Sequence, residues 1–306
     1  MIVVVCPGQG SQTPGFLAPW LERPGIAERL GQLSDAAGLD LAHFGTAADA
    51  DEIRNTAVAQ PLIVAAGILT LGELFADGRV ERIGGIAGHS VGELTAAAGA
   101  GILSDADAVS LVAVRGAAMA EAAGLVRTGM SAVLGADEAT LAPKLAALGL
   151  EPANFNGGGQ IVVAGDLDAL DALKADPLPG TRVMPLQVAG AFHTSFMTPA
   201  VERVAAAAAA LDPADPSLPL WTNRDGSAVA SGREYLDLIV GQVSSPVRWD
   251  ACMASFEAAG VTGIIEVAPA GALVGLAKRA LKGVPTVAVK TPDDLDAAID
   301  LIAQAA

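Results

Sequence analysis

The sequence is poor in the residue types from which metal sites and disulfide frameworks are built. Its 306 residues include only two cysteines and three histidines, and aromatic residues make up 4 % of the chain. No cluster of these residues has the spacing of metal ligands, so we expect no metal site. Cys6 and Cys252 lie far apart in the sequence and are predicted to be free, buried thiols, which is typical of a cytoplasmic protein.

Positive charge and long apolar runs are scarce as well. Lys and Arg number 18 against 34 Asp and Glu, which gives a formal net charge of -16. A field of that sign repels phosphates and disfavours nucleic acid and anionic membranes as partners. No apolar run of membrane-spanning length is free of glycine and charge, and no basic segment precedes the apolar residues 2–6. We therefore expect neither a membrane span nor a signal peptide.

The common nucleotide-binding loops are also missing. Residues 7–12 (Pro-Gly-Gln-Gly-Ser-Gln) follow an apolar first strand, but Thr13 stands where a dinucleotide loop needs its third glycine, and no P-loop pattern occurs. This loop can still aim backbone N–H groups and the Gln9 amide at a site on the edge of the sheet. The alternative is a plain turn that ends the strand.

What the chain does have is a Gly-His-Ser-Val-Gly segment at residues 88–92. It follows an apolar run, residues 83–87, and precedes a helical pattern at 93–98. G-x-S-x-G between a strand and a helix is typical of a nucleophile elbow, in which the glycines permit a sharp turn and the serine hydroxyl is exposed. We predict that Ser90 is a nucleophile. The alternative is a tight turn whose serine only caps the helix.

A nucleophilic serine needs a general base, and few are available. His89 adjoins Ser90 and should point away from it, and His43 has no evident connection to the elbow. Elimination favours His193, which follows a glycine-containing turn, as the general base. The alternative is that His193 is a structural histidine. No acidic residue has a sequence pattern that marks it as the third member of a catalytic triad. A backbone or amide carbonyl is therefore a candidate to orient the imidazole.

Arg115 is the second candidate site residue. It falls on the apolar stripe of a helix that is predicted to begin at Ser104, and a buried guanidinium must find an anion. One possibility is an internal salt bridge to Glu93 or Glu121. The other is a fork that grips a substrate carboxylate with two parallel hydrogen bonds.

The order of predicted elements indicates an α/β protein. Residues 125–189 are predicted to alternate as β-α-β-β-α-β, the ferredoxin-like order, and to form an inserted subdomain. Residues 1–124 and 190–306 alternate strands and helices, which favours a mainly parallel sheet covered on both faces. The helix predicted over 60–77 has Pro61 in its first turn. The remaining predictions outside the insertion are helices at 25–37, 198–211, 235–243, 271–282 and 293–304 and strands at 218–223, 263–267 and 286–289.

Six motifs in order along the chain give it a family resemblance. They are Pro7–Gln12, Gly88–Glu93, Arg115-Gly116, Asn154–Asn156, Phe192-His193 and Pro246–Trp249. With these residues the chain resembles the malonyl-CoA:acyl-carrier-protein transacylases of bacterial fatty-acid synthesis. The resemblance covers nearly the whole chain and implies an α/β-hydrolase-like core that carries the ferredoxin-like insertion.

The resemblance also implies roles for individual residues. Ser90 would be the nucleophile, His193 its base, and Arg115 the group that holds the malonyl carboxylate. The backbone N–H groups of Gln9 and Val91 would form an oxyanion hole.

Two further roles follow from the resemblance. The main-chain carbonyl of Gln242 would orient His193. Phe192 would block an α-methyl group on the substrate, although Gly190 departs from the histidine that opens the H-A-F-H signature of malonyl-selective relatives.

The implied substrates are malonyl-CoA and holo acyl carrier protein, with no cofactor and no metal. For docking an acidic carrier protein we predict a patch of Lys278, Arg279 and Lys282; the alternative is a solvated helix end that complements its own dipole. Other functions that share the elbow are a polyketide or malonate-decarboxylase acyltransferase, a serine esterase or thioesterase, and an inactive scaffold that only docks carrier proteins.

Overall fold

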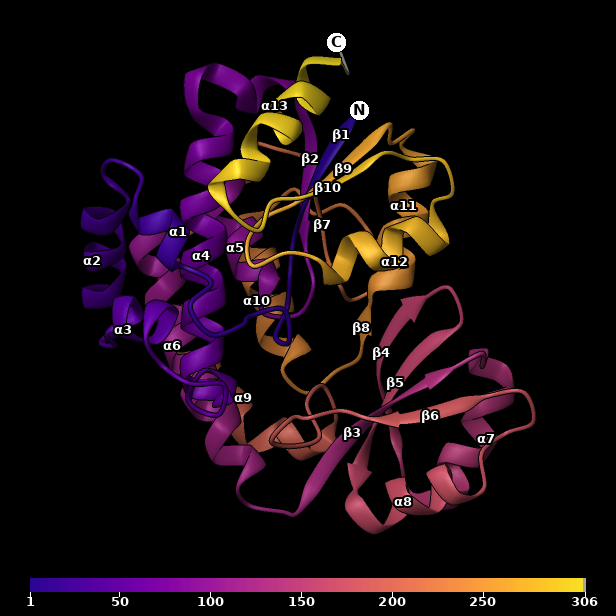
Figure 1. Cartoon of the computed structure of the whole chain (residues 1–306). Helices are drawn as coiled ribbons and strands as arrows, with labels where there is room; N and C mark the ends of the chain where they lie inside the picture. Colours follow the sequence, from indigo (N-terminus) through magenta and orange to yellow (C-terminus); the bar gives the residue numbers. More distant parts are fainter. Residues whose placement is uncertain (305–306) are drawn as a thin grey trace.

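The computed structural model describes residues 1–304, and its strands form two five-stranded sheets (Figure 1). The first sheet has the order β10-β9-β1-β2-β7 and the second the order β6-β3-β5-β4-β8. The chain is therefore α/β, as predicted, with one parallel and one mixed sheet.

Every strand pair of the first sheet is parallel. In chain order its strands are β1 (Ile2–Cys6), β2 (Ile83–Gly88), β7 (Leu220–Trp221), β9 (Gly263–Glu266) and β10 (Thr286–Ala288). Alternate residues of β1 enter different apolar clusters: Ile2 and Val4 join one, and Val3 and Val5 join the other. Both faces of this sheet are thus covered, which explains why its strands consist of continuous apolar runs.

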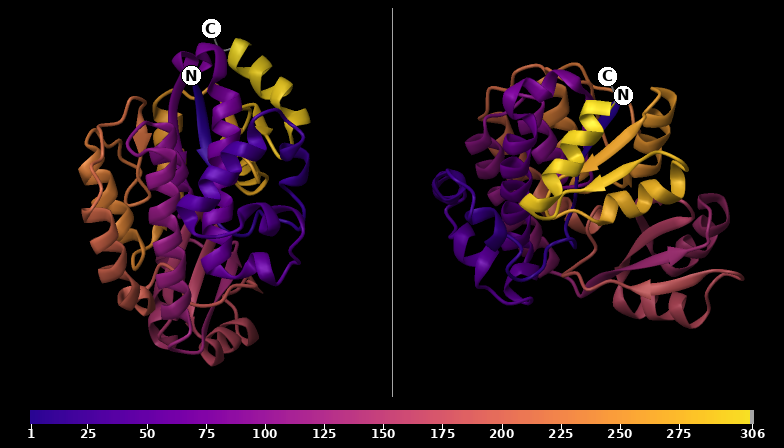
Figure 2. Two further views of the ribbon diagram at one scale, coloured as in Figure 1. Left: turned by 90° about the vertical axis from the view of Figure 1, so that its left-hand side faces the viewer. Right: turned by 45° about the horizontal axis from the view of Figure 1, so that its top comes forward.

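Helices supply the two covering layers. The larger cluster is built with α2 (Ile26–Ala37), α4 (Thr56–Phe75), α5 (Gly92–Gly99), α6 (Asp105–Ala123), α9 (Thr198–Ala209), α10 (Gly232–Gln242) and α13 (Leu295–Gln304). The smaller cluster is built with α11 (Trp249–Ala258) and α12 (Ala272–Ala280). Figure 2 shows the long helices α4 and α6 packed side by side in the larger layer. Short helices α1 (Ala18–Leu21) and α3 (Leu41–Thr46) lie beside α2.

The second sheet comes mainly from one continuous stretch of chain. It contains β3 (Thr128–Leu134), β4 (Glu151–Gly157), β5 (Gln160–Asp166) and β6 (Arg182–Pro185), with helices α7 (Glu138–Leu148) and α8 (Leu167–Ala175) between them. The predicted β-α-β-β-α-β order is confirmed, and these strands pair antiparallel. Strand β8 (Val247–Arg248) joins β4 in parallel from much later in the sequence and so ties the two sheets together.

The start of α4 differs from the prediction. The helix begins at Thr56, because the side chain of Asn55 accepts a hydrogen bond from the N–H of Ala57 and caps it. Pro61 therefore lies inside the helix rather than in its first turn, and that prediction was wrong.

The segment Thr56–Arg82 is also long and apolar enough, by composition, to cross a membrane. However, 83 % of its most apolar window is buried within the protein, which is typical of a core helix.

Other elements depart from expectation as well. Strand β7 covers only Leu220–Trp221 instead of 218–223. Helix α11 was not predicted. It places Cys252, Met253 and Phe256 in the smaller cluster. The spacing of these residues is helical, but the prediction considered this region only for the motif Pro246–Trp249.

Candidate active site

The turn at Ser90 has the geometry of a nucleophile elbow. Ser90 adopts a left-handed backbone conformation (φ 54°) between β2 and α5. A Cβ at Gly88 would overlap the backbone of Gly92, and a Cβ at Gly92 would overlap the carbonyl of Cys6. The predicted steric reason for both glycines is confirmed. A non-glycine residue held in this conformation is strained, and such strain often accompanies function.

His193 lies directly against the serine. Its Nε2 is 2.6 Å from Ser90 Oγ, and its Nδ1 is 2.9 Å from the backbone carbonyl oxygen of Gln242, the last residue of α10. Because a carbonyl can only accept, Nδ1 carries the hydrogen and Nε2 presents a lone pair to the Ser90 hydroxyl. The three residues that sequence reasoning selected for this end of the site are thus brought together. Their catalytic roles remain predictions.

Electrostatics keep the imidazole neutral. Burial and, after it, the positive charge of Arg115 lower the pKa of His193 to about 3, whereas the hydrogen bond to Gln242 acts in the opposite direction. Neutral imidazole is the form that can accept a proton.

Two residues that line the same small cavity have backbone N–H groups without an acceptor among residues 1–304. Gln9, Val91 and Ser90 line a hollow of about 110 Å³, and no acceptor in the described part of the chain takes the N–H of Gln9 or of Val91. The N–H of Ser90 itself is occupied, because it donates to Oδ1 of Asn223 (2.7 Å). The two N–H groups without an acceptor, those of Gln9 and Val91, are therefore the ones predicted to form an oxyanion hole.

Arg115 is fully buried, and no carboxylate of the described residues is in direct contact with it. Its Nη1–H donates to Oε1 of Gln60 (2.6 Å) and its Nη2–H to Oε1 of Gln242 (3.0 Å), while Nε has no partner within residues 1–304. The alternative of a direct salt bridge is therefore not found for either candidate acid. Glu121 pairs with Arg203, and Glu93 lies on the far side of the Gln242 amide.

The guanidinium stands behind the cavity rather than in its wall. Gln60 lines the cavity, and Arg115 lies immediately behind it. Burial lowers the pKa of Arg115 to about 10 and Glu93 acts in the opposite direction, so the group stays charged at neutral pH. A cation whose direct hydrogen-bond partners are neutral amide oxygens is suited to bind an anion.

Sequence reasoning missed three polar residues that hold this site together. Asn223 and Gln60 were not singled out, and Glu93 was considered only as a salt-bridge partner. All three are buried. The available signal was their polarity in apolar surroundings: Gln60 within a continuous apolar helix, Glu93 directly after the elbow, and Asn223 just past the end of β7.

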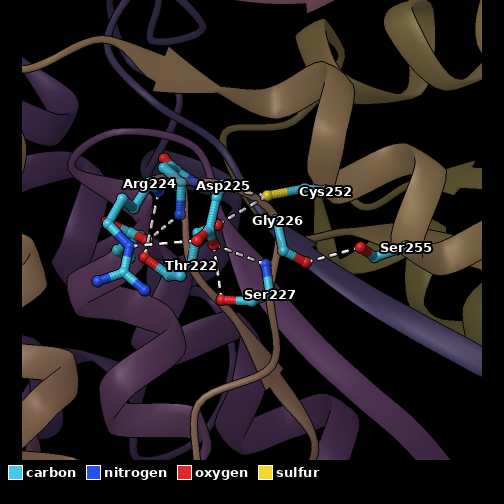
Figure 3. A network of polar contacts seen from close by, with 9 residues as sticks. Thr222, Arg224, Asp225, Gly226, Ser227, Cys252 and Ser255 are labelled. Carbon is cyan, nitrogen blue, oxygen red and sulfur yellow. Dashed lines mark hydrogen bonds and ion pairs between the residues drawn. The ribbon is translucent and has the colours of Figure 1, made fainter.

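Asn223 is placed by an anchored turn. In Figure 3, the thiol of Cys252 donates to the carbonyl of Thr222, and the hydroxyl of Ser255 donates to that of Gly226, so α11 holds the turn from both sides. Fixed in this way, Asn223 donates to the carbonyl of Gly88 (2.7 Å) and accepts from the N–H of Ser90. It therefore braces both sides of the elbow.

The remaining predicted residues take varied places. Phe192 lines the Ser90 cavity. His89 also lines that cavity, where its Nε2 is 2.9 Å from Oδ1 of Asn156, and His43 is exposed on α3. The basic residues Lys278, Arg279 and Lys282 are exposed on and just after α12.

Both cysteines are free and buried, as predicted. Within residues 1–304, no group of three or more potential ligands could hold a metal ion.

Comparison with known proteins gives a consistent result. The family model described as "Acyl transferase domain" matches residues 3–293. The chain is 53 % identical over 300 residues to a malonyl CoA-acyl carrier protein transacylase of Mycobacterium tuberculosis, covering 97 % of this chain and 98 % of that one. It is 34 % identical over 304 residues to the protein of the same name from Escherichia coli, again covering 97 % and 98 %.

Solved structures agree with the sequence relatives. The crystal structure of MCAT from M. tuberculosis superposes with a TM-score of 0.94 at 52 % identity, covering 98 % of this chain and 99 % of that one. A malonyl-transacylase solved in complex with a type II PKS acyl-carrier protein gives 0.90 at 29 % identity, covering 98 % and 99 %. The chain therefore belongs to the acyl transferase family and, within it, to the malonyl-CoA:acyl-carrier-protein transacylases.

Proposed function

We propose that this enzyme transfers the malonyl group of malonyl-CoA to the phosphopantetheine thiol of an acyl carrier protein, through a malonyl ester on Ser90. The observation that carries the proposal is the joint geometry of Ser90, His193 and Arg115. A serine hydroxyl lies 2.6 Å from a neutral imidazole, and a buried guanidinium that lacks a carboxylate partner stands one side chain behind their cavity.

The two half-reactions follow from this geometry. Ser90 Oγ attacks the thioester carbonyl while His193 Nε2 takes the hydroxyl proton, and the oxygen that becomes negative receives the N–H groups of Gln9 and Val91. The C–S bond then breaks, and His193 returns the proton to the departing CoA thiolate. In the second half, His193 deprotonates the carrier's thiol, which attacks the malonyl ester. Ser90 recovers the proton as the thioester forms.

Arg115 and Phe192 account for the choice of acyl group. A malonyl carboxylate that displaces Gln60 would gain the free Nε–H and the Nη groups of Arg115, whereas an acetyl group would bring no carboxylate into contact with that guanidinium. The cavity beside Ser90 holds only about 110 Å³, and Phe192 forms part of its wall. Branching next to the acyl carbonyl is therefore disfavoured.

The pantetheine arm has one evident route to the serine. A second hollow of about 470 Å³ shares Gln9, Leu186 and Val188 with the Ser90 cavity and extends to Arg54. We propose that the arm lies in this hollow, against the partly exposed Leu186.

The finer description of the fold belongs to the same proposal. The antiparallel order β6-β3-β5-β4 supports a ferredoxin-like subdomain at residues 125–189, inserted in an α/β-hydrolase-like core of residues 1–124 and 190–306. Buried free thiols at Cys6 and Cys252 suit a cytoplasmic enzyme. The polyketide-type neighbour supports a second candidate for the carrier, namely a polyketide acyl carrier protein.

Trapping of the acyl-enzyme tests the proposal. Labelled malonyl-CoA should label the wild-type protein stoichiometrically, the label should persist in water, and holo acyl carrier protein should discharge it. Ser90→Ala should abolish labelling. Rapid hydrolysis of the label would indicate an esterase or thioesterase, and a wild-type protein that takes up no label would indicate a scaffold.

A further inference from the structure

Glu93 is a buried carboxylate for which the proposed reaction has no use. It lies in the first turn of α5, three residues after the nucleophile, and its side chain is out of contact with solvent. Oε1 accepts the backbone N–H of Asn223 (2.7 Å), and Oε2 accepts the side-chain N–H of Gln242. Both oxygens face donors, so the hydrogen bonds fit the ionised form.

The Gln242 amide links this carboxylate to Arg115. Its nitrogen donates to Glu93, and its oxygen accepts from Nη2 of Arg115 (3.0 Å). The amide dipole is therefore oriented with its positive end at the anion and its negative end at the cation. The backbone carbonyl of Gln242 also accepts the hydrogen bond from His193 Nδ1. Gln242 therefore contacts Glu93, Arg115 and the imidazole.

The other titratable groups around Glu93 carry no charge near neutral pH. Burial lowers the pKa of His193, and burial raises the pKa values of Tyr235 and Cys252, with Glu93 contributing to both increases. Burial also raises the pKa of Glu93, but the N–H of Asn223 and the charge of Arg115 act in the opposite direction, and a donor on each oxygen favours the carboxylate form. Among the described residues of the site, Arg115 is thus the cation and Glu93 the candidate counter-anion.

We propose that Glu93 is the resident counterion of Arg115 and that it limits how strongly the site prefers a charged acyl group over an uncharged one. Without Glu93, the empty enzyme would contain an uncompensated buried guanidinium, which is a costly state. With it, a malonyl carboxylate must share Arg115 with an anion already present. Glu93 is then a positioning residue that affects selectivity through Arg115 and the Gln242 amide.

The experiment compares malonyl with acetyl loading in Glu93→Gln, and this readout rests on the proposed function. Removal of one negative charge should raise the ratio of kcat/KM for malonyl-CoA to that for acetyl-CoA by about tenfold, the effect of one unit charge across several ångströms of partly screened interior. A purely structural role would lower both values together and leave the ratio unchanged. An unchanged or reduced ratio would overturn the proposal.

Two matched variants separate charge from shape. Glu93→Asp keeps the charge but shortens the side chain, so the ratio should stay near that of the wild type even if both rates fall. Glu266→Gln alters another buried glutamate, whose oxygens accept backbone N–H groups at the start of α12. It should lower stability without changing the ratio, and a change as large as that of Glu93→Gln would argue against a specific role.

A stability cycle tests the pairing without any assay of transfer. In denaturant unfolding, Glu93→Gln and Arg115→Met should each destabilise the protein, because each leaves one buried charge unpaired. The double variant should be clearly more stable than the sum of the single effects predicts. If Glu93→Gln alone is insoluble, the double variant should restore soluble protein. Strict additivity, or an equally insoluble double variant, would overturn the counterion proposal even if malonyl transfer is confirmed.

Discussion

The two ends of the site are built in opposite ways. At the Ser90 end, backbone geometry does most of the positioning: Ser90 and His193 have left-handed conformations (φ 54° and 62°), two glycines permit the turn, and a main-chain carbonyl orients the imidazole. At the Arg115 end, side chains from α4, α5, α6 and α10 hold one another through amides and charges.

Under the proposed function, this difference assigns separate tasks to the two ends. The backbone-built end contains groups that any acyl thioester would use, because every such substrate has a carbonyl for the serine to attack. The side-chain end contains a charge that only an anionic acyl group can satisfy. Changes at the first end should therefore affect all acyl donors alike, and changes at the second should affect malonyl selectively. The following predictions test that separation.

The largest selective effect is expected from Arg115→Ala. Malonyl loading should fall by roughly 100-fold or more, because the carboxylate would be buried without its cation, while acetyl loading should change little. The measurement is kcat/KM for both donors. Arg203→Ala, which removes an exposed arginine paired with Glu121, is the matched control and should alter neither. Equal losses for malonyl and acetyl would contradict the carboxylate role.

The pH dependence of loading probes the chemical end. Because burial lowers the pKa of His193 to about 3, its neutral form persists in mild acid. The kcat/KM for acetyl-CoA should therefore stay level from about pH 7.5 to about pH 5.5, whereas an imidazole of ordinary pKa would lose about tenfold.

The same profile in Arg115→Ala shows whether the two ends are independent. Arg115 is the second cause of the lowered His193 pKa, so its removal should raise that pKa and move the acid limb toward neutrality. Identical profiles in the two proteins would mean that the ends are electrostatically separate.

The smallest effect is expected at the surface. Charge reversal of Lys278 and Arg279 should raise KM for holo acyl carrier protein by about threefold to tenfold and leave malonyl-CoA loading unchanged, because exposed charges are screened. Lys174→Glu, which also removes a basic residue from the last turn of a helix, controls for the effect on the helix dipole. A KM that does not respond would favour the alternative that these residues only complement the end of α12.

Local sequence was sufficient for much of this molecule. The strand–turn–helix around Ser90 was predictable because its glycines and apolar flanks act within a few residues. The order of elements in residues 128–185 followed from hydrophobic periodicity, and the small number of histidines left His193 as the predicted base by elimination. The start of α4 was missed because the Asn55 cap competed with a proline that suggested a later start.

The sequence by itself therefore determined which groups are available for chemistry and which short segments they occupy. Only the tertiary structure decided that Arg115 contacts two amides instead of an acid, and that Gln242 joins it to Glu93 and to His193. The physical reason is that these contacts join residues 49 to 149 positions apart. No periodicity or spacing encodes such contacts; the packing of α5, α6 and α10 around the first sheet creates them.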